Sequence, residues 1–179
     1  MNDTFFSSKD VIELYRTLNQ LQIYIWIDGG WGVDALLGEQ TRVHKDLDIV
    51  IQEKNLERFC ALLTIQGYTE VLQNDSCAWN FVLGDDQGHN VDIHVINFDI
   101  HGNGIYGPTE RGVFYPAEAL LGMGEIDGET VCCLSAQYQV QSHSGYELKE
   151  KDFNDVFALC KKFNIPLPEE YQEGDGAHQ

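Results

Sequence analysis

Apolar side chains recur at helical spacing in two segments of the first half of the chain, residues 8–21 and 53–66. The apolar face of the first segment consists of Val11, Leu14, Tyr15, Leu18 and Leu21, and that of the second of Leu56, Phe59, Leu62 and Leu63. Ser7 and Asp10 have the spacing of a capping box, and Gly67 marks a helix stop. The pattern therefore predicts two amphipathic helices.

Short runs of β-favouring residues separate these helices. Residues 23–27 are apolar on both faces, which is typical of an interior strand, and the run stops at Asp28-Gly29-Gly30. A short helix over 31–37, closed by Gly38, is predicted to follow. Further strands are predicted over 46–51, 69–72, 79–83 and 90–97, and turn-forming residues 84–88 join the last two into an antiparallel hairpin. This order predicts an α/β fold with a mixed β-sheet and helices packed on it.

The character of the chain changes in residues 98–128. Its seven glycines are Gly102, Gly104, Gly107, Gly112, Gly122, Gly124 and Gly128. Together with two prolines they predict surface loops, apart from two short strands around 124–126 and 129–134 that a turn at Asp127-Gly128 joins. Helices are predicted again over 135–143 and 148–163. We expect a sheet-bearing domain over 1–134, a C-terminal helical portion over 135–171 and a disordered tail over 172–179.

The excess of acidic residues narrows the classes of partner that the protein can bind. The chain has 11 basic and 29 acidic residues, a formal net charge of −18 at pH 7. Such a chain repels nucleic acid and attracts divalent metals or a substrate with amines, although the surplus acid can also serve solubility alone. No apolar run approaches the roughly 20 residues that span a bilayer, and the polar start lacks a signal-peptide layout. Five cysteines without a CxxC spacing indicate reduced thiols, so we expect a cytoplasmic protein.

Three carboxylates carry the candidate chemistry. Asp46 and Asp48 lie two residues apart on a predicted strand and so share one face, about 7 Å apart at Cα. A divalent cation would offset the cost of burying them, whereas an edge strand would leave them solvated. Asp92 and His94 share a face of a later strand, and if that strand lies beside the first, a third acid meets the pair. Such a trio suits phosphoryl or nucleotidyl transfer, in which two acids hold magnesium and the third removes a proton.

A glycine pair supplies a candidate phosphate site. Gly29 and Gly30 lie between a predicted strand and a helix, where backbone N–H groups can approach phosphate. The alternative is an ordinary tight turn. Their place 15 residues ahead of the Asp46–Asp48 pair favours the phosphate interpretation.

Together these motifs resemble the DNA polymerase beta-like nucleotidyltransferase superfamily. More narrowly, the segments WIDGGWGVD (26–34), RVHKDLDI (42–49), VDIHVIN (91–97) and HSGYEL (143–148) resemble the small lincosamide nucleotidyltransferases. The related aminoglycoside 2″-nucleotidyltransferases share the Gly-Gly-Trp, R-x-H-x-D-[IL]-D and third-acid features. The likeness covers roughly residues 10–160, and residues 98–128 and the last helix match poorly.

The resemblance implies a nucleotidyltransferase domain, and it implies roles for particular residues. Asp46, Asp48 and Asp92 would hold Mg²⁺, Asp92 would also be the general base, Gly29 and Gly30 would receive the triphosphate of ATP or GTP, and Arg42 with His44 or Lys45 would neutralise its charge. The implied reaction transfers AMP to a hydroxyl of a lincosamide and releases pyrophosphate. His94 would at most orient groups, Trp31 would face the nucleotide or pack its helix, and Tyr146 would pack in the core.

Several alternatives stay open at this stage. An aminoglycoside acceptor fits the −18 charge better, whereas the motifs favour a lincosamide. A metal phosphohydrolase could use the same acids, and a catalytically silent nucleotide-binding or antitoxin-like module could keep the fold. The aromatic and acidic residues of the 98–128 segment, among them Tyr106, Glu110, Phe114 and Tyr115, suit a sugar-bearing, amine-containing antibiotic.

Overall fold

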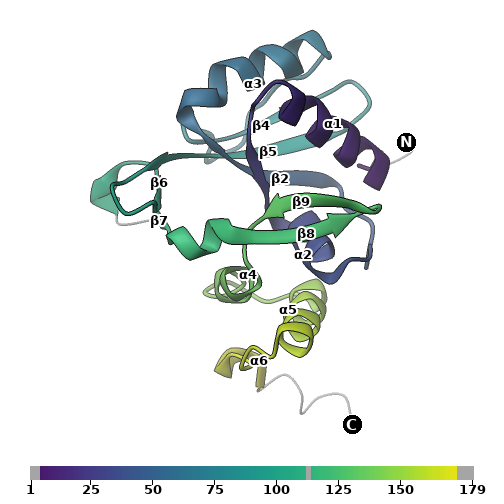
Figure 1. Ribbon diagram of the computed structural model, residues 1–179, viewed down its shortest axis with the longest axis vertical. Helices are drawn as coiled ribbons and strands as arrows, with labels where there is room; N and C mark the ends of the chain where they lie inside the picture. The colour runs from purple at the N-terminus through teal and green to yellow at the C-terminus, as the bar shows by residue number, and fades with distance from the viewer. Residues whose placement is uncertain (1–4, 112–113, 173–179) are drawn as a thin grey trace.

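The computed structural model describes residues 5–111 and 114–172, and within them the strands form one mixed sheet (Figure 1). The strands are β1 (Ile25–Ile27), β2 (Asp46–Gln52), β3 (Thr69–Val71), β4 (Asn80–Gly84), β5 (Asn90–Phe98), β6 (Gly104–Tyr106), β7 (Phe114–Tyr115), β8 (Gly122–Ile126) and β9 (Glu129–Cys133). Their order is β3-β4-β5-β2-β1-β9-β8, and β6 pairs with both β5 and β7. The predicted α/β fold with a mixed sheet is confirmed.

The direction of the central strands determines which residues meet. β2 runs parallel to β5 and antiparallel to β1, while β1 runs parallel to β9. The predicted hairpin of β4 and β5 is antiparallel, as is the pair β8–β9 around Asp127-Gly128, where both residues have positive φ. The strand predicted over 23–27 is shorter, because the Ile23 N–H still donates to Leu18 O in the turn that ends the first helix.

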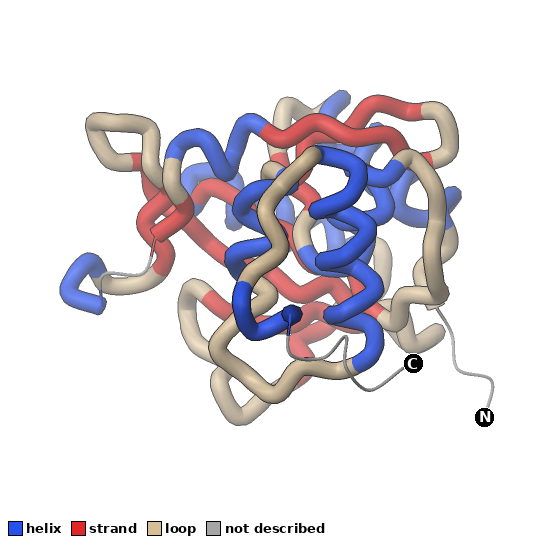
Figure 2. Tube along the Cα trace, turned by 90° about the horizontal axis from the view of Figure 1, so that it is seen from below, coloured by secondary structure: helices blue, strands red, loops and turns tan. Residues whose placement is uncertain are grey.

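The helices pack on the sheet and on one another. They are α1 (Ser8–Gln20), α2 (Gly29–Leu37), α3 (Glu53–Ile65), α4 (Ala136–Ser142), α5 (Glu150–Phe163) and α6 (Glu169–Gln172), with 3₁₀ helices at Thr109–Arg111 and Ala117–Leu121. Figure 1 shows α1 and α3 above the sheet and α4, α5 and α6 below it, and Figure 2, seen from below, shows helices in front of the strands. The predicted capping box of Ser7 and Asp10 is present at the start of α1.

Helix α2 starts earlier than predicted. It begins at Gly29 instead of Trp31, because the Asp28 side chain caps it by accepting a hydrogen bond from Gly29 N at 2.7 Å. The glycine pair therefore forms the first turn of the helix and not a separate loop. The predicted end at Gly38 is confirmed, with φ at +76°.

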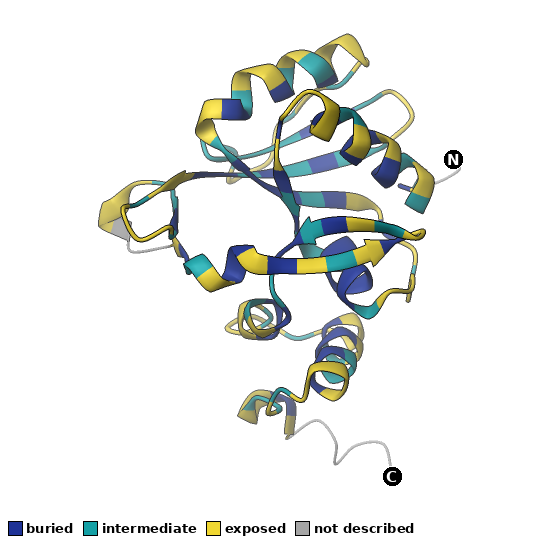
Figure 3. Ribbon diagram, viewed as in Figure 1, coloured by how far each residue is buried: buried dark blue, intermediate teal, exposed yellow. Residues whose placement is uncertain are grey.

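Alternation along β2 divides the core into two clusters. Leu47, Ile49 and Ile51 are buried in the main cluster, whereas Val50 belongs to a smaller one on the opposite face. The smaller cluster consists of Val50, Ile96, Tyr115, Ala119, Leu120 and Leu134. Figure 3 shows the burial concentrated along the central strands and the inward sides of the helices. Asp48 shares the Val50 face, so it lies beside apolar packing.

The prediction of loops over residues 98–128 is wrong for much of that segment. β5 runs on to Phe98, and Gly104–Tyr106 returns along it as β6 with Gly104 opposite Phe98. The reason is local packing: a Cβ at Gly104 would lie 2.6 Å from Ile96 Cδ1, so a glycine lets the two strands approach. Asp99 accepts the hydrogen bonds that close the connection, from Asn103 N among others.

The C-terminal helices follow the prediction except at the end. Asn164 caps α5 in the left-handed conformation with φ at 54°. The short helix α6 was not predicted; its Tyr171 is fully buried and packs on Phe153 and Phe157. Gln172, predicted in the tail, ends α6, and the predicted disordered residues 173–179 lie outside the described residues.

Two further predictions concern the whole chain. The five cysteines, all of them among the described residues, are free thiols, as predicted. None of the helices in residues 5–111 and 114–172 combines the length and the apolar content needed to cross a bilayer.

Candidate active site

The predicted acids meet on neighbouring strands. In the parallel pair β2–β5, Asp48 stands opposite Asp92, and Asp46 stands opposite Asn90. Asp48 and Asp92 are half-buried, and Asp46 is exposed at the start of its strand. The sequence analysis expected the third acid to meet the first two only if the two strands were neighbours, and the pairing of β2 with β5 shows that they are.

A further acid, Asp28, completes the cluster and was missed as a site residue. Its backbone N–H donates to Asp48 O at 2.9 Å. Its Oδ1 accepts hydrogen bonds from Gly29 N and, at 3.1 Å, from Gln139 Nε2 of α4, while Oδ2 lies 3.8 Å from His94 Nδ1. The available signal was its place at the end of an interior strand, directly before the glycine pair.

The carboxylates of the cluster repel one another. Burial, followed by the charges of Asp46, Asp28 and Asp92, raises the pKa of Asp48 from its ordinary 3.8 to about 7. Burial also raises the pKa of Asp92, although His94 counteracts this. Asp92 Oδ1 is buried without a hydrogen-bond partner, with His94 Nε2 3.7 Å away. A bound cation would offset this repulsion and give the Asp92 oxygen a partner.

The donor set fits a hard divalent metal that the substrate helps to hold. Among the described residues, no three His, Cys, Asp or Glu side chains already converge on one metal position. Magnesium, however, is usually bound by one or two carboxylates together with waters and substrate phosphates, and not by an all-protein cage. Asp48 and the unpartnered oxygen of Asp92 offer such carboxylates on adjacent strands.

The glycine pair packs directly against the acids and a cationic side chain. Gly29 has φ at +53°, and a Cβ there would lie 2.0 Å from Asp48 Oδ2. A Cβ at Gly30 would lie 2.3 Å from His44 Nδ1 and 2.8 Å from Arg42 Nη2. The first turn of α2 therefore lies between Asp48 on one side and Arg42 with His44 on the other.

Arg42 and His44 belong to one hydrogen-bonded chain. Arg42 Nη1 lies 2.9 Å from His44 Nδ1, Arg42 Nη2 donates to Asp155 Oδ2 at 3.0 Å, and His44 Nε2 bonds to Asp34 Oδ2. Because a guanidinium can only donate, His44 Nδ1 must accept, and its Nε2–H donates to Asp34. His44 is 2 % exposed and has both nitrogens occupied. The assignment of His44 to the triphosphate therefore does not fit this geometry, whereas Arg42 stays partly exposed.

His94 links the acids to the aromatic residues of the 98–128 segment. Burial alone would lower its pKa, but Asp28, Asp92 and Asp48 together raise it. Tyr115 is buried with its hydroxyl 3.2 Å from His94 Nδ1, and the Tyr106 ring packs edge-on to His94 with centroids 5.4 Å apart. Of the three predicted aromatic contact residues, Phe114 is exposed and Tyr115 is not.

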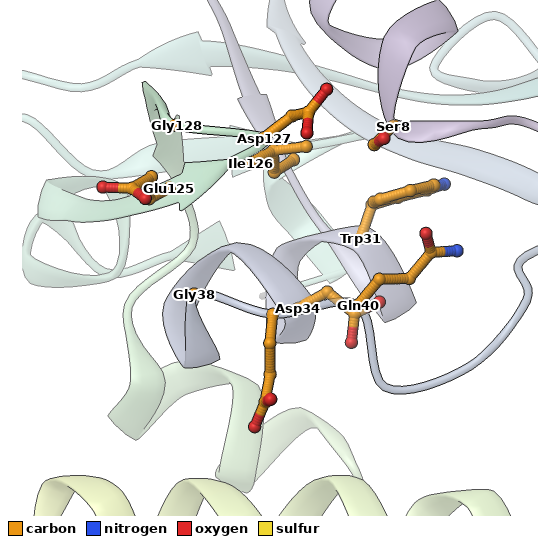
Figure 4. Close-up of a pocket in the computed structure, with 10 residues that line it drawn as sticks. Ser8, Trp31, Asp34, Gly38, Gln40, Glu125, Ile126, Asp127 and Gly128 are labelled. Carbon is orange, nitrogen blue, oxygen red and sulfur yellow. The ribbon is translucent and has the colours of Figure 1, made fainter.

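The predicted packing role is found for Trp31 but not for Tyr146. Trp31 is 1 % exposed and packs on His44, so its helix-packing role is the correct one. It also lines a hollow of about 350 Å³ that includes Asp34 and Glu125 but none of the clustered acids (Figure 4). Tyr146 is 50 % exposed and donates to Asp152, so the prediction of core packing was wrong for it.

The sheet, the paired acids and the glycine turn define a nucleotidyltransferase fold. The chain belongs to the aminoglycoside-2″-adenylyltransferase family, whose sequence model matches residues 10–159. It is 28% identical over 157 residues to a lincosamide resistance protein of Staphylococcus haemolyticus, covering 87% of this chain and 96% of that one. Family membership implies a nucleotide donor and a divalent metal.

Solved structures agree with this placement. The lincosamide antibiotic adenylyltransferase LnuA, in its lincomycin-bound crystal structure, aligns with a TM-score of 0.76 and 26% identity over 91% of this chain and 100% of its own. The structure of ANT(2″)-Ia in complex with adenylyl-2″-tobramycin shares the fold, with a TM-score of 0.65, 18% identity and 95% coverage of both chains.

Proposed function

We propose that this protein transfers AMP from Mg²⁺-bound ATP to a hydroxyl group of a lincosamide and releases pyrophosphate. The observation that carries the proposal is the pairing of Asp48 with Asp92 beside the glycine turn of α2. The lincosamide acceptor is supported by the two relatives above, both of which are named for lincosamides and both of which this chain covers almost entirely.

The acids would divide the work. Asp46, Asp48 and Asp92 would hold Mg²⁺, which when bound supplies charge neutralisation at the phosphate oxygens. Asp92 also accepts the proton of the acceptor hydroxyl while that oxygen bonds to the α-phosphorus and the bond from the α-phosphorus to the pyrophosphate oxygen breaks. Its unpartnered Oδ1 and its raised pKa support this role.

The neighbouring groups bind and orient. Gly29 and Gly30 bring the N-terminus of α2 to the triphosphate, where a side chain would collide with Asp48 or Arg42. Arg42 supplies positive charge over Gly30, and we assign His44 to the orientation of Arg42 instead of to phosphate contact. His94, between Asp92 and Asp28, orients the base.

The acceptor would be bound beside the 98–128 segment. Exposed Phe114 and Glu110 offer an apolar surface and a carboxylate for a sugar-bearing amine. The net charge of −18 favours a more cationic acceptor, so an aminoglycoside is the second candidate, supported by family membership. The free thiols support a cytoplasmic location, and the acidic surface supports a small-molecule acceptor over a nucleic acid.

A panel assay tests the proposal. Pyrophosphate release is measured with Mg²⁺ and either ATP or GTP, against a lincosamide, an aminoglycoside and no acceptor, with Asp92→Asn as the matched inactive control. The proposal expects pyrophosphate only when a lincosamide is present. Orthophosphate without an acceptor would indicate a phosphohydrolase, and absence of turnover with nucleotide binding intact would indicate a silent module.

A further inference from the structure

We infer that Asp155, on the C-terminal helix α5, is a positioning residue for the nucleotide donor, because it holds the Arg42 guanidinium over Gly30. The inference rests on the proposed role of Arg42 at the triphosphate. The two residues are 113 positions apart in the chain, and the link places part of the nucleotide site under the control of the C-terminal helical portion.

The contact is charged and shielded from water. The Asp155 side chain is 4% exposed and the Arg42 side chain 30%, and Arg42 Nη2 lies 3.0 Å from Asp155 Oδ2. Burying a carboxylate so deeply is costly unless a cation and a hydrogen bond accompany it. Arg42 provides both, so this ion pair is far less screened than a surface pair.

Two contacts fix the direction of the guanidinium. Nη2 is held by Asp155 and Nη1 by His44, whose ring is anchored in turn by Asp34. Asp34 is itself held by Thr41, which donates from its backbone N at 3.1 Å and from its hydroxyl. Arg42 Nε remains buried without a partner. The guanidinium is thus held through both terminal nitrogens, with Nη2 beside Gly30, where the proposed triphosphate would lie.

Asp155 has two opposing effects on an anion bound by Arg42. Its negative charge repels phosphate, whereas its oxygen keeps the guanidinium in one orientation and spares ATP the entropy of ordering it. Two substitutions separate these effects. Asp155→Asn removes the charge but keeps a carbonyl oxygen that can accept from Arg42, and Asp155→Ala removes both.

The test measures the dissociation constant of MgATP by calorimetry without an acceptor, and KM and kcat with one. For Asp155→Ala we expect the Kd and KM for ATP to rise about tenfold, the size expected for one charge-assisted hydrogen bond, with kcat and the acceptor KM nearly unchanged. Asp155→Asn should recover most of the affinity. In an Arg42→Ala background, Asp155→Ala should no longer weaken ATP binding, because there is no guanidinium left to hold.

Asp152 is the matched control. It lies one turn earlier on α5, is buried to the same degree as Asp155 and accepts hydrogen bonds from Lys149 N and the Tyr146 hydroxyl, away from Arg42. Asp152→Ala should lower the melting temperature without changing the Kd for ATP. If Asp155→Ala fails to fold, Arg42→Lys replaces it, since lysine keeps the charge and loses the two-point anchoring; its Kd should also rise.

Three results bear on the role of Asp155 in ATP binding. ATP binding equal to or tighter than wild type in Asp155→Ala, or in Arg42→Lys when that variant is used, overturns the inference. The inference is also overturned if Asp155→Ala weakens ATP binding as strongly in the Arg42→Ala background as in the wild type. If the wild type binds ATP but modifies no lincosamide, the proposed acceptor fails while the binding constants still decide the role of Asp155. A wild type that does not bind MgATP overturns both.

Discussion

Gly29 lies directly against Asp48: a Cβ on Gly29 would stand 2.0 Å from Asp48 Oδ2. The start of α2 and the acid on β2 are therefore in close contact. This contact brings the N-terminus of the helix and the carboxylate proposed to bind the metal to the same point, where a triphosphate with its metal would need both.

Gly29→Ala should abolish transfer. Its backbone has φ at +53° and its Cβ would displace the Asp48 carboxylate. Gly38→Ala is the matched control at the other end of α2, since Gly38 has φ at +76° but its Cβ would meet nothing closer than Lys162 Nζ at 3.9 Å. Each variant should lose about 1–2 kcal/mol of stability from the left-handed backbone. Only Gly29→Ala should lose pyrophosphate release; equal activity in the two variants would contradict the role of the contact.

Asp46→Asn and Asp48→Asn should each eliminate Mg²⁺-dependent pyrophosphate release while the fold survives. The amide keeps the shape of the carboxylate but not the negative charge that the metal needs. Activity is measured beside thermal melting. A folded variant that turns over at the wild-type rate would refute the assignment of that residue to the metal.

Asp48 should make the metal-free protein less stable as the pH rises. Burial and the neighbouring acids raise its pKa from 3.8 to about 7. A carboxyl whose pKa is raised by folding contributes stability that is full below about pH 4 and is lost as the pH rises through about 7. In EDTA, the melting temperature of wild type relative to Asp48→Asn should therefore fall between these pH values, and Mg²⁺ should reduce the fall. A difference that is constant with pH would contradict the raised pKa.

Asp92→Asn should separate binding from turnover. As a general base its loss should lower kcat by about 10²–10⁴-fold. The Kd for MgATP should change little, because Asp46 and Asp48 remain. Calorimetry and steady-state kinetics measure the two quantities. If nucleotide binding collapses together with kcat, Asp92 is chiefly a metal ligand and the base lies elsewhere.

The acceptor surface is tested at Glu110 and Phe114. Both are exposed, so alanine should raise the antibiotic KM several-fold while the ATP KM stays within about twofold, because only acceptor binding is lost. Tyr106→Phe serves as the comparison, since Tyr106 packs against His94 and its hydroxyl donates to Asn80. An unchanged antibiotic KM in both alanine variants would place acceptor recognition on another surface.

Much of the fold and the Asp46–Asp48 pair could be predicted because those features are local. The periodicity of α1 and α3 and the alternation of β2 and β5 are each contained within one segment, and the Asp46–Asp48 pair follows from strand geometry alone. The features that the sequence did not predict depend on contacts between segments that are far apart in the chain. β6 forms because β5 extends far enough to pair with Gly104, against a composition that favours loops.

Dependence on tertiary contacts also explains why two features of the site could not be predicted. Asp155 and Gln139 come from helices with ordinary amphipathic patterns, and only the folded chain brings them to Arg42 and Asp28. The partners of His44 could not be predicted either, because spacing places it beside Arg42 but does not reveal that Asp34 occupies its second nitrogen.

Label transfer from ATP tests the central claim most directly. The purified protein is incubated with Mg²⁺, a lincosamide and ATP labelled in the α-phosphate or, separately, in the γ-phosphate. The account predicts that the α-label appears on the antibiotic, that the γ-label appears in pyrophosphate, and that Asp92→Asn yields neither at a comparable rate. Release of the γ-label as orthophosphate, or an α-label that never reaches the antibiotic although ATP is consumed, would contradict it.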